Sequence, residues 1–216
     1  MIIFLLPPSE GKTAGGELTT EKTRFTFDKP LDIAVNATPK DLKCQWARYE
    51  EWISLNKSVL DWPFMPAIER YSWVMFKAVE YAGMTEAGRM FFNEHFMIVS
   101  GLYGLTTPCD AVANYKLPIS TKWLTQRWWA KLTDALNDLN PDIVVDLLPW
   151  SYKKVINFSK LNAKVIQIDF YQIENNEKKK LTHGVKKVKG QWVKEICETQ
   201  ETLVFGVAEG KIEIIR

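Results

Sequence analysis

Residues 1–13, Met-Ile-Ile-Phe-Leu-Leu-Pro-Pro-Ser-Glu-Gly-Lys-Thr, decide the fold class that this chain is expected to adopt. The five consecutive apolar residues from Ile2 to Leu6 predict a strand that is buried on both faces, as in a parallel sheet. Pro7 and Pro8 end this strand because proline cannot donate to a sheet ladder. The polar residues from Ser9 to Thr13 are therefore expected on a loop at the edge of the sheet.

The second half of the chain adds further strands. Ile143 to Leu148 and Val165 to Phe170 are apolar runs, and a short helix near Ser151 to Phe158 is predicted between them. A strand, a helix and a strand in this order indicate a βαβ unit with a parallel pair of strands. Thr202 to Val207 and Ile212 to Ile215 are expected to close the chain as strands. The prediction is an α/β fold with a mixed, partly parallel sheet flanked by helices.

Helical periodicity predicts the helices that flank this sheet. Thr38-Pro39-Lys40-Asp41 has the form of a capping box with proline at the first helical position. Further helices are expected after Trp73, from Thr121 to Asn140, and around Trp192 near the end of the chain. The apolar positions that should face the core are Leu42, Trp46, Tyr49 and Ile53, then Leu124, Trp128, Leu132, Ala135 and Leu139, then Val185, Val188, Trp192 and Ile196.

Length and composition favour a single domain over residues 1–216. Of these residues, 46% are hydrophobic and 25% are charged, which suits one substantial core. The N-terminal apolar run is too short for a signal peptide or a membrane span, so a cytoplasmic monomer without membrane contact is expected. The three cysteines and two histidines lack the spacing of a disulfide framework or a metal site, so no metal and no cofactor is predicted.

The loop after the first strand carries a polar cluster. Gly11-Lys12-Thr13 is similar to the end of a phosphate-binding P-loop, but GxxxxGK[ST] requires glycine where Leu6 stands, so a P-loop is not predicted. Ser9, Glu10 and Lys12 could still bind an anion or transfer protons. The alternative is an ordinary turn between strand and helix with a capping serine.

The main charge feature is a basic segment from Lys178 to Lys194, which holds seven lysines and no acid. This segment should attract phosphate groups by steering and counterion release. Lys186, Lys187 and Lys189 crowd the expected first turn of the last helix, where positive charge loses up to about 1 kcal/mol against the helix dipole. Free amides and ammonium groups together form an anion site. The alternatives are that the helix begins elsewhere or that these lysines pair with acids.

A second candidate for phosphate contact is Gly101-Leu102-Tyr103-Gly104, which follows the apolar run Phe96 to Val99. The two glycines give this tetrapeptide the form of a tight hairpin. Such hairpins can offer backbone amides to a phosphate, as in helix-hairpin-helix elements that bind DNA. A purely structural turn is the alternative.

Several of these segments resemble those of the YaaA family. Ser100 to Leu105 matches the start of the family motif SGLYG-hhxPxDxhxxYxL. Phe76 to Gly83 is similar to the FKGxxYxGL block, Pro7 to Thr13 to the PPSEGKT form, and Lys186 to Gly190 to the KKxRG segment. The later positions of the first motif are Pro108, Asp110, Tyr115, Lys116 and Leu117. The resemblance spans nearly the whole chain.

This resemblance implies a mixed α/β fold with a helix-hairpin-helix-like element and a positive cleft that binds duplex or branched DNA. It also implies a physiological link to hydrogen peroxide, oxidative stress and intracellular iron. It implies no particular reaction, so whether the protein is an enzyme is left open.

The leading functional hypothesis is DNA binding without sequence specificity in the peroxide stress response. The candidate nucleic-acid-binding residues are Lys12, Gly101, Leu102, Tyr103, Gly104, Lys116, Lys186, Lys187 and Lys189. A rival hypothesis is a small-molecule enzyme, because loops at the ends of parallel strands meet in a crevice that can hold an anionic ligand. Its candidate catalytic residues are Ser9, Glu10, Lys12 and Tyr115, with Lys116 and Lys186 or Lys187 as anion holders. A basic face that binds a protein or RNA partner is a third possibility.

Overall fold

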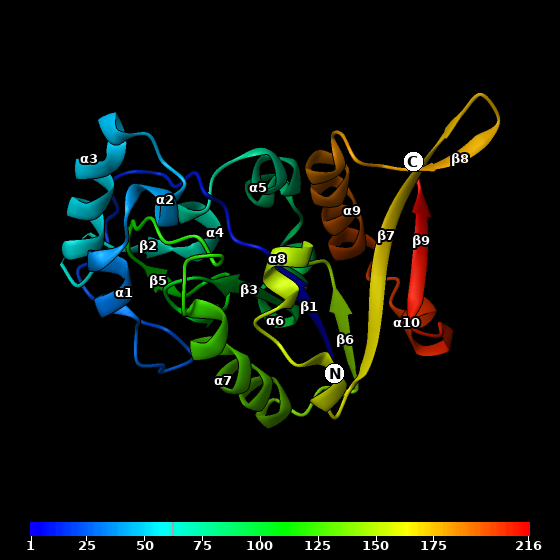
Figure 1. Cartoon of the computed structure of the whole chain (residues 1–216). Helices are drawn as coiled ribbons and strands as arrows, with labels where there is room; N and C mark the ends of the chain where they lie inside the picture. Colours follow the sequence, from blue (N-terminus) through cyan, green and yellow to red (C-terminus); the bar gives the residue numbers. More distant parts are fainter. Residues whose placement is uncertain (62) are drawn as a thin grey trace.

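A computed structural model describes residues 1–61 and 63–216 of the chain (Figure 1). Within these ranges, a seven-stranded sheet has the order β4-β3-β1-β6-β7-β8, and β9 pairs with β7 outside this path. The pairs β1–β3, β1–β6, β6–β7 and β7–β9 are parallel, whereas β3–β4 and β7–β8 are antiparallel. The strands are β1 (Ile2–Leu6), β3 (Phe96–Ser100), β4 (Gly104–Thr106), β6 (Ile143–Asp146), β7 (Lys164–Glu174), β8 (Glu177–Lys180) and β9 (Lys211–Ile215). The mixed, partly parallel sheet is thus confirmed.

Helices flank this sheet. α6 (Glu86–His95) contacts β1, and α9 (Val185–Thr199) contacts β7, α6 and α5 (Val74–Val79). α7 (Leu124–Asp138) contacts β4. Figure 1 shows α1 to α4 grouped with the short antiparallel strands β2 and β5 at one end of the molecule, and β7 to β9 at the other. The other α-helices and strands are α1 (Leu31–Asn36), α2 (Pro39–Leu42), α3 (Trp46–Lys57), β2 (Met65–Pro66), α4 (Ala67–Arg70), β5 (Ala111–Val112), α8 (Trp150–Lys153) and α10 (Leu203–Val207).

β1 is an interior strand of the sheet, as its sequence predicts. Its neighbours β3 and β6 both run parallel to it, and the residues from Ile3 to Leu6 are inaccessible to solvent. The ring of Phe4 stacks on that of Phe96 in β3 with 4.5 Å between centroids, and meets the ring of Phe205 edge-on at 5.5 Å. A strand that is paired on both edges and covered on both faces must be apolar throughout, which explains the uninterrupted run.

The predicted capping box is present, but the helix that it starts is shorter than predicted. The backbone amide of Asp41 donates to Thr38 Oγ1 at 3.2 Å, and that of Thr38 donates to Asp41 Oδ2 at 2.9 Å. α2 nevertheless ends after one turn, because Lys43 adopts a left-handed conformation with φ 54°. The chain re-enters a helix only at Trp46, whose side chain is 75% exposed. The prediction of one continuous helix with Trp46 on its buried face was wrong.

Thr202 to Val207, predicted as a strand, forms the helix α10 instead. A short apolar run cannot be assigned to strand or helix by periodicity alone. Here tertiary packing decides the conformation, because the buried ring of Phe205 packs against Phe4 and Trp192. The neighbouring prediction, a strand over Ile212 to Ile215, is confirmed by β9.

The segment from Gly101 to Gly104 is a turn between the antiparallel strands β3 and β4, in which Ser100 pairs with Gly104. Gly104 has φ +72°, and a Cβ at Gly101 would lie 2.2 Å from the carbonyl oxygen of Leu117. The two glycines therefore serve backbone geometry and close packing. Because strands flank this turn, the expected helix-hairpin-helix-like element is not confirmed.

Residues 1–61 and 63–216 contain neither a membrane-spanning helix nor a cluster of metal ligands. None of the helices found there has the length and apolar character that a membrane crossing requires. In the same ranges, no three His, Cys, Asp or Glu side chains lie close enough to hold one metal ion.

Candidate functional site

The carboxyl ends of β1 and β6 open into a cleft. Strand order reverses at this point, because β1 is followed in the chain by β3 on one side of it and later by β6 on the other. In open α/β sheets such a switch point separates the loops and leaves a crevice. Pro7 to Thr13 leave β1 here, and Leu147 to Pro149 leave β6 towards α8. Two adjoining cavities fill the cleft, and Pro8, Ser9, Glu10 and Tyr152 line both.

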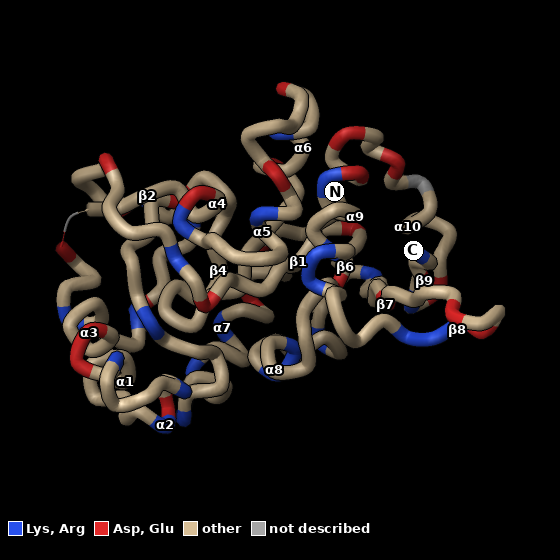
Figure 2. The backbone as a smooth tube through the Cα atoms, turned by 90° about the horizontal axis from the view of Figure 1, so that it is seen from above, with Lys and Arg blue, Asp and Glu red and all other residues tan. Residues whose placement is uncertain are grey.

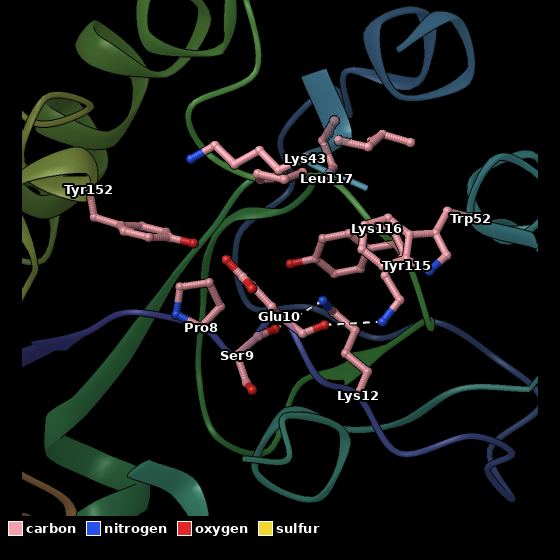
Figure 3. Close-up of a pocket in the computed structure, with 12 residues that line it drawn as sticks. Pro8, Ser9, Glu10, Lys12, Lys43, Trp52, Tyr115, Lys116, Leu117 and Tyr152 are labelled. Atoms are coloured by element: carbon pink, nitrogen blue, oxygen red, sulfur yellow. Dashed lines mark hydrogen bonds between the residues drawn. The ribbon is translucent and has the colours of Figure 1, made fainter. Parts of the chain in front are cut away.

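The first cavity is small, about 40 Å³, and combines cations with aromatic rings. Figure 3 shows Lys12 and Lys116 beside Tyr115, with Trp52 close by and Lys43 at the rim. The second cavity, about 170 Å³, lies between the loop after β1 and the start of α5 and α9. Its lining is largely apolar, with Trp73, Val74, Met75 and Phe76 on one side and Lys186 and Lys189 on the other.

Lys12 is the central cation of the first cavity. Its Nζ donates to the carbonyl oxygen of Ser9 at 3.1 Å and lies 4.0 Å from the centroid of the Tyr115 ring. Burial, followed by the positive charges of Lys116 and Arg70, holds the pKa of Lys12 well below its usual range. Glu10 opposes this effect, but its charge is the smallest contribution. A lysine with a lowered pKa can supply an unprotonated amine.

Tyr115 supports Lys12 but does not offer a free hydroxyl. Its buried hydroxyl is 2.7 Å from Ser100 Oγ and 3.0 Å from the hydroxyl of Tyr71. The backbone amide of Tyr103 also donates to Ser100 Oγ, at 2.9 Å. Burial raises the pKa of Tyr115 well above its usual range. Its ring is what Lys12 contacts, so Tyr115 is suited to hold a cation and not to exchange protons at neutral pH.

Glu10, Tyr152 and Lys116 form the mouth of the first cavity. Figure 3 shows the Tyr152 hydroxyl pointing towards the Glu10 carboxylate. Burial, with contributions from the charges of Tyr71 and Glu10, raises the pKa of Tyr152. Lys116 Nζ donates to the main-chain oxygen of Glu10 at 3.1 Å and lies 5.2 Å from the ring centroid of Trp52. Glu10 is exposed, so its carboxylate can meet a ligand.

Ser9 has a structural contact. Its buried hydroxyl donates to the carbonyl oxygen of Ser72, and the backbone amide of Ser72 donates to the carbonyl oxygen of Gly11 at 3.1 Å. Thr13 extends this contact, since its amide donates to the carbonyl oxygen of Arg70 at 2.8 Å. The loop after β1 is therefore fixed along its length, which places Lys12 in the cavity.

The lysines of α9 divide into two groups. Helix α9 begins at Val185 after Gly184, which supplies no side-chain cap, so Lys186 and Lys187 lie in its first turn and Lys189 begins the second. Lys189 points inward and donates to the carbonyl oxygen of Leu147, and burial lowers its pKa to about 8. Lys186 and Lys187 are exposed, and Lys186 lines the second cavity.

All four remaining lysines in the basic segment have acidic partners. Lys178 lies 2.5 Å from Glu213, Lys180 lies 2.8 Å from Asp169, and Lys194 lies 2.6 Å from Glu80. Lys179 is paired with Glu174 at 3.4 Å. Figure 2 shows the blue stretch at β8 next to red segments of the same hairpin. Acids thus pair with the lysines of β8 and with Lys194 in α9. Among residues 1–61 and 63–216, no acid lies within ion-pair distance of Lys186, Lys187 or Lys189, for which this alternative was considered.

The residues from Gly101 to Gly104 lie apart from the cleft lining. All four are buried, and the indole nitrogen of Trp128 donates to the carbonyl oxygen of Gly101 at 2.9 Å. Tyr103 packs against Tyr115 with 5.7 Å between ring centroids. The turn therefore supports the floor of the site from inside and presents no exposed amides.

Sequence reasoning missed Tyr152 and the pair of Asp146 and Lys153. Asp146 is buried at the end of β6, and its Oδ2 lies 2.5 Å from Lys153 Nζ on α8. Its Oδ1 accepts the backbone amide of Leu148 at 2.9 Å. A carboxylate that ends a buried strand is the signal that could have marked this position. Tyr152 carries no such signal, because its place depends on how α8 packs.

Comparisons with known proteins identify the family of this chain. The family described as peroxide stress protein YaaA matches residues 1–209. A UPF0246 protein of Acaryochloris marina is 29% identical over 201 residues, covering 89% of this chain and 77% of that protein. UPF0246 proteins of Malacoplasma penetrans and Rickettsia conorii are 30% and 28% identical over 135 and 139 residues. These two alignments cover 59% and 61% of this chain, and only 54% and 56% of the relatives. With the match spanning nearly its whole length, the chain belongs to the peroxide stress protein YaaA family.

Proposed function

We propose that the cleft binds a small anionic substrate and that the protein is an enzyme acting on it. The observation that carries this proposal is the position of Lys12 and Lys116 in one cavity, where both ammonium groups donate to main-chain carbonyls and not to carboxylates. Within residues 1–61 and 63–216 neither lysine has an ion-pair partner, and such cations in a recessed, ring-lined site are available to neutralise a ligand. The exposed carboxylate of Glu10 at the same mouth supplies a group for proton transfer.

The dimensions of the cleft also favour a small ligand. A cavity of about 150 Å³ accepts a benzene ring, and the second cavity measures about 170 Å³. Its apolar wall and the two α9 lysines suit a compact molecule with one apolar part and one anionic group. A duplex phosphate on the molecular surface would reach the rim of this cleft more readily than its floor.

Binding can be tested with pyrophosphate, inorganic phosphate and mononucleotides, using thermal shift and calorimetry. A ligand at about 100 times its Kd stabilises the protein by about 2.7 kcal/mol. Lys116→Met should remove most of this stabilisation, whereas Lys57→Met, at an exposed lysine of α3, should leave it unchanged. Absence of stabilisation by all of these anions, or equal stabilisation of both variants, would contradict the proposal.

Anion binding is predicted to depend on pH through Lys189. Its pKa of about 8 means that the free protein loses this positive charge as pH rises through 8. A bound anion favours the protonated form, so affinity should be greatest below pH 8 and fall by up to tenfold per pH unit above it. Calorimetry in buffers of different ionisation enthalpy should show proton uptake on binding near this pH. Lys189→Met should remove this component, and persistence of the same proton uptake in the variant would exclude Lys189 as its source.

DNA binding is the second candidate function, and Lys186 and Lys187 are the observation that favours it. Both are exposed in the first turn of a 15-residue helix, where a phosphate would offset their repulsion from the helix dipole. Lys186 Nζ also lies 5.6 Å from the ring centroid of Trp73, whose side chain is half exposed. In this hypothesis Lys12, Lys116 and Lys189 contact phosphate within the cleft and Lys186 and Lys187 contact it at the rim.

Replacing Lys186 and Lys187 together by glutamate tests this second candidate. Acids in the first turn of α9 should leave the free protein equally stable or raise its stability by up to about 1 kcal/mol per site. Affinity for DNA should fall sharply, and the slope of log K against log salt should become flatter by about two units. Thermal melts and anisotropy titrations at several salt concentrations measure both quantities. A variant that melts much earlier and binds DNA normally would show that these lysines are structural.

A further inference from the structure

The ammonium group of Lys12 has an unusual position for a lysine. It lies between the loop carbonyl of Ser9, at 3.1 Å, and the rings of Tyr115 and Tyr71, whose centroids are 4.0 Å and 5.5 Å away. The charged side chains with the largest effect on the pKa of Lys12 are both cations, Lys116 and Arg70. The side chain lines the first cavity together with Glu10 and Lys116 (Figure 3).

Two opposing effects decide the protonation of this amine. The faces of Tyr115 and Tyr71 attract the ammonium form. Burial and the neighbouring cations disfavour the ammonium form, and these effects dominate, since the pKa of Lys12 is held well below its usual range. A larger fraction of Lys12 than of an exposed lysine is therefore an unprotonated nucleophile at neutral pH.

We propose that Lys12 is a carbonyl-reactive amine that forms a Schiff base with a small aldehyde or ketone bearing an anionic group. This inference rests on the proposed binding of a small anion in the cleft. The Nζ lone pair attacks the carbonyl carbon, a C–N bond forms as the C=O π bond breaks, and the oxygen takes up one proton while the nitrogen releases one, which gives a neutral carbinolamine. Loss of that hydroxyl as water, with a second proton, leaves a protonated imine on Lys12. The overall step consumes the amine, the carbonyl compound and one proton, and yields the iminium ion and water.

The residues around Lys12 suit the other requirements of this step. Lys116, anchored on the main chain of Glu10, can neutralise the anionic group of the substrate. The exposed Glu10 carboxyl group can relay protons from water to the carbonyl oxygen and to the departing hydroxyl, and the Tyr152 hydroxyl points towards it (Figure 3). The contact between Ser9 and Ser72 fixes the loop that carries both Glu10 and Lys12.

The inference can be tested by reductive trapping on the intact protein. Glyoxylate and glycolaldehyde phosphate, each with cyanoborohydride at neutral pH, are used as probes, and the modified lysine is located by peptide mapping. Lys12 should be labelled at least about tenfold faster than the exposed Lys57 and Lys122 of the same molecule, since a lowering of pKa by one unit raises the amine fraction about tenfold. Labelling of Lys12 at or below the rate of these lysines would overturn the inference.

Two further measurements separate this inference from the binding proposal. Excess pyrophosphate should slow labelling of Lys12 without affecting Lys57, and Lys12→Arg, which keeps the cation beside Tyr115, should abolish the specific adduct. If pyrophosphate stabilises the protein but Lys12 is not labelled preferentially, the Schiff-base inference fails alone. If neither occurs, the binding proposal fails with it.

Discussion

Arg70→Met is expected to lower the free energy of unfolding by about 3–5 kcal/mol, because the substitution removes three hydrogen bonds of a buried guanidinium and leaves the buried carbonyl of Val112 without this donor. Arg70 is inaccessible to solvent. Its guanidinium donates to the carbonyl oxygens of Val112 at 3.3 Å, Pro63 at 3.2 Å and Thr13. These carbonyls belong to β5, to the segment before β2 and to the loop after β1. A single side chain therefore ties three separate segments together.

The planar guanidinium of arginine carries several N–H groups and can donate to all three carbonyl oxygens. Lysine has one nitrogen and cannot reach all of them, so Arg70→Lys should recover only part of the loss. Since Thr13 ends the loop that carries Lys12, both variants should also weaken anion binding in the cleft. The expected effect on binding is secondary to that on stability, because Arg70 does not line either cavity.

Urea denaturation and thermal melting measure the effect of Arg70. For a chain of this size, a loss of 3–5 kcal/mol should lower Tm by roughly 10 °C. Arg48→Met is the matched control, since Arg48 is exposed on α3 and its replacement should change stability by less than about 0.5 kcal/mol. Equal stability of the Arg70 and Arg48 variants would show that the three carbonyls are satisfied in another way.

The central strand and the long helices could be predicted from the sequence because their signals are local. An uninterrupted apolar run identified β1, and periodicity identified α7 and α9. The prediction of one helix across Lys43 failed because a left-handed residue has no periodic signature. α10 was misassigned because its conformation depends on the packing of Phe205 against β1 and α9.

The candidate site could be predicted only in part, and for the same reason. Lys12, Glu10 and Lys116 were found as polar residues at a strand end or in a family motif, and the cleft does bring them together. Arg70 was missed because its partners are main-chain carbonyls from distant segments, which no side-chain pattern reveals. Conversely, Lys178 and Lys180 looked available in the sequence, whereas their acids come from β9 and β7.

Gly190→Ala is expected to destabilise the protein by about 1–3 kcal/mol, although alanine is the better helix former. Gly190 lies inside α9, where alanine would gain up to about 1 kcal/mol in the absence of other contacts. Its position faces α5, however, and an added Cβ would lie 2.3 Å from the carbonyl oxygen of Met75 and 2.8 Å from the Cβ of Ala78. The backbone of Met75 cannot move aside as a flexible side chain can, so α9 would have to move away from α5.

Movement of α9 would also change the cleft, because the second cavity lies between α5 and α9 and Lys186 and Lys189 belong to α9. Gly190→Ala should therefore weaken anion binding together with stability, and Gly190→Val should do both more strongly. The matched control is Gly206→Ala in α10, where an added Cβ meets no atom within 4 Å. This control should be neutral or stabilising by up to about 1 kcal/mol. Urea denaturation of the two alanine variants compares their free energies of unfolding. If both substitutions are stabilising, α9 does not approach α5 as closely as the contact with Met75 requires.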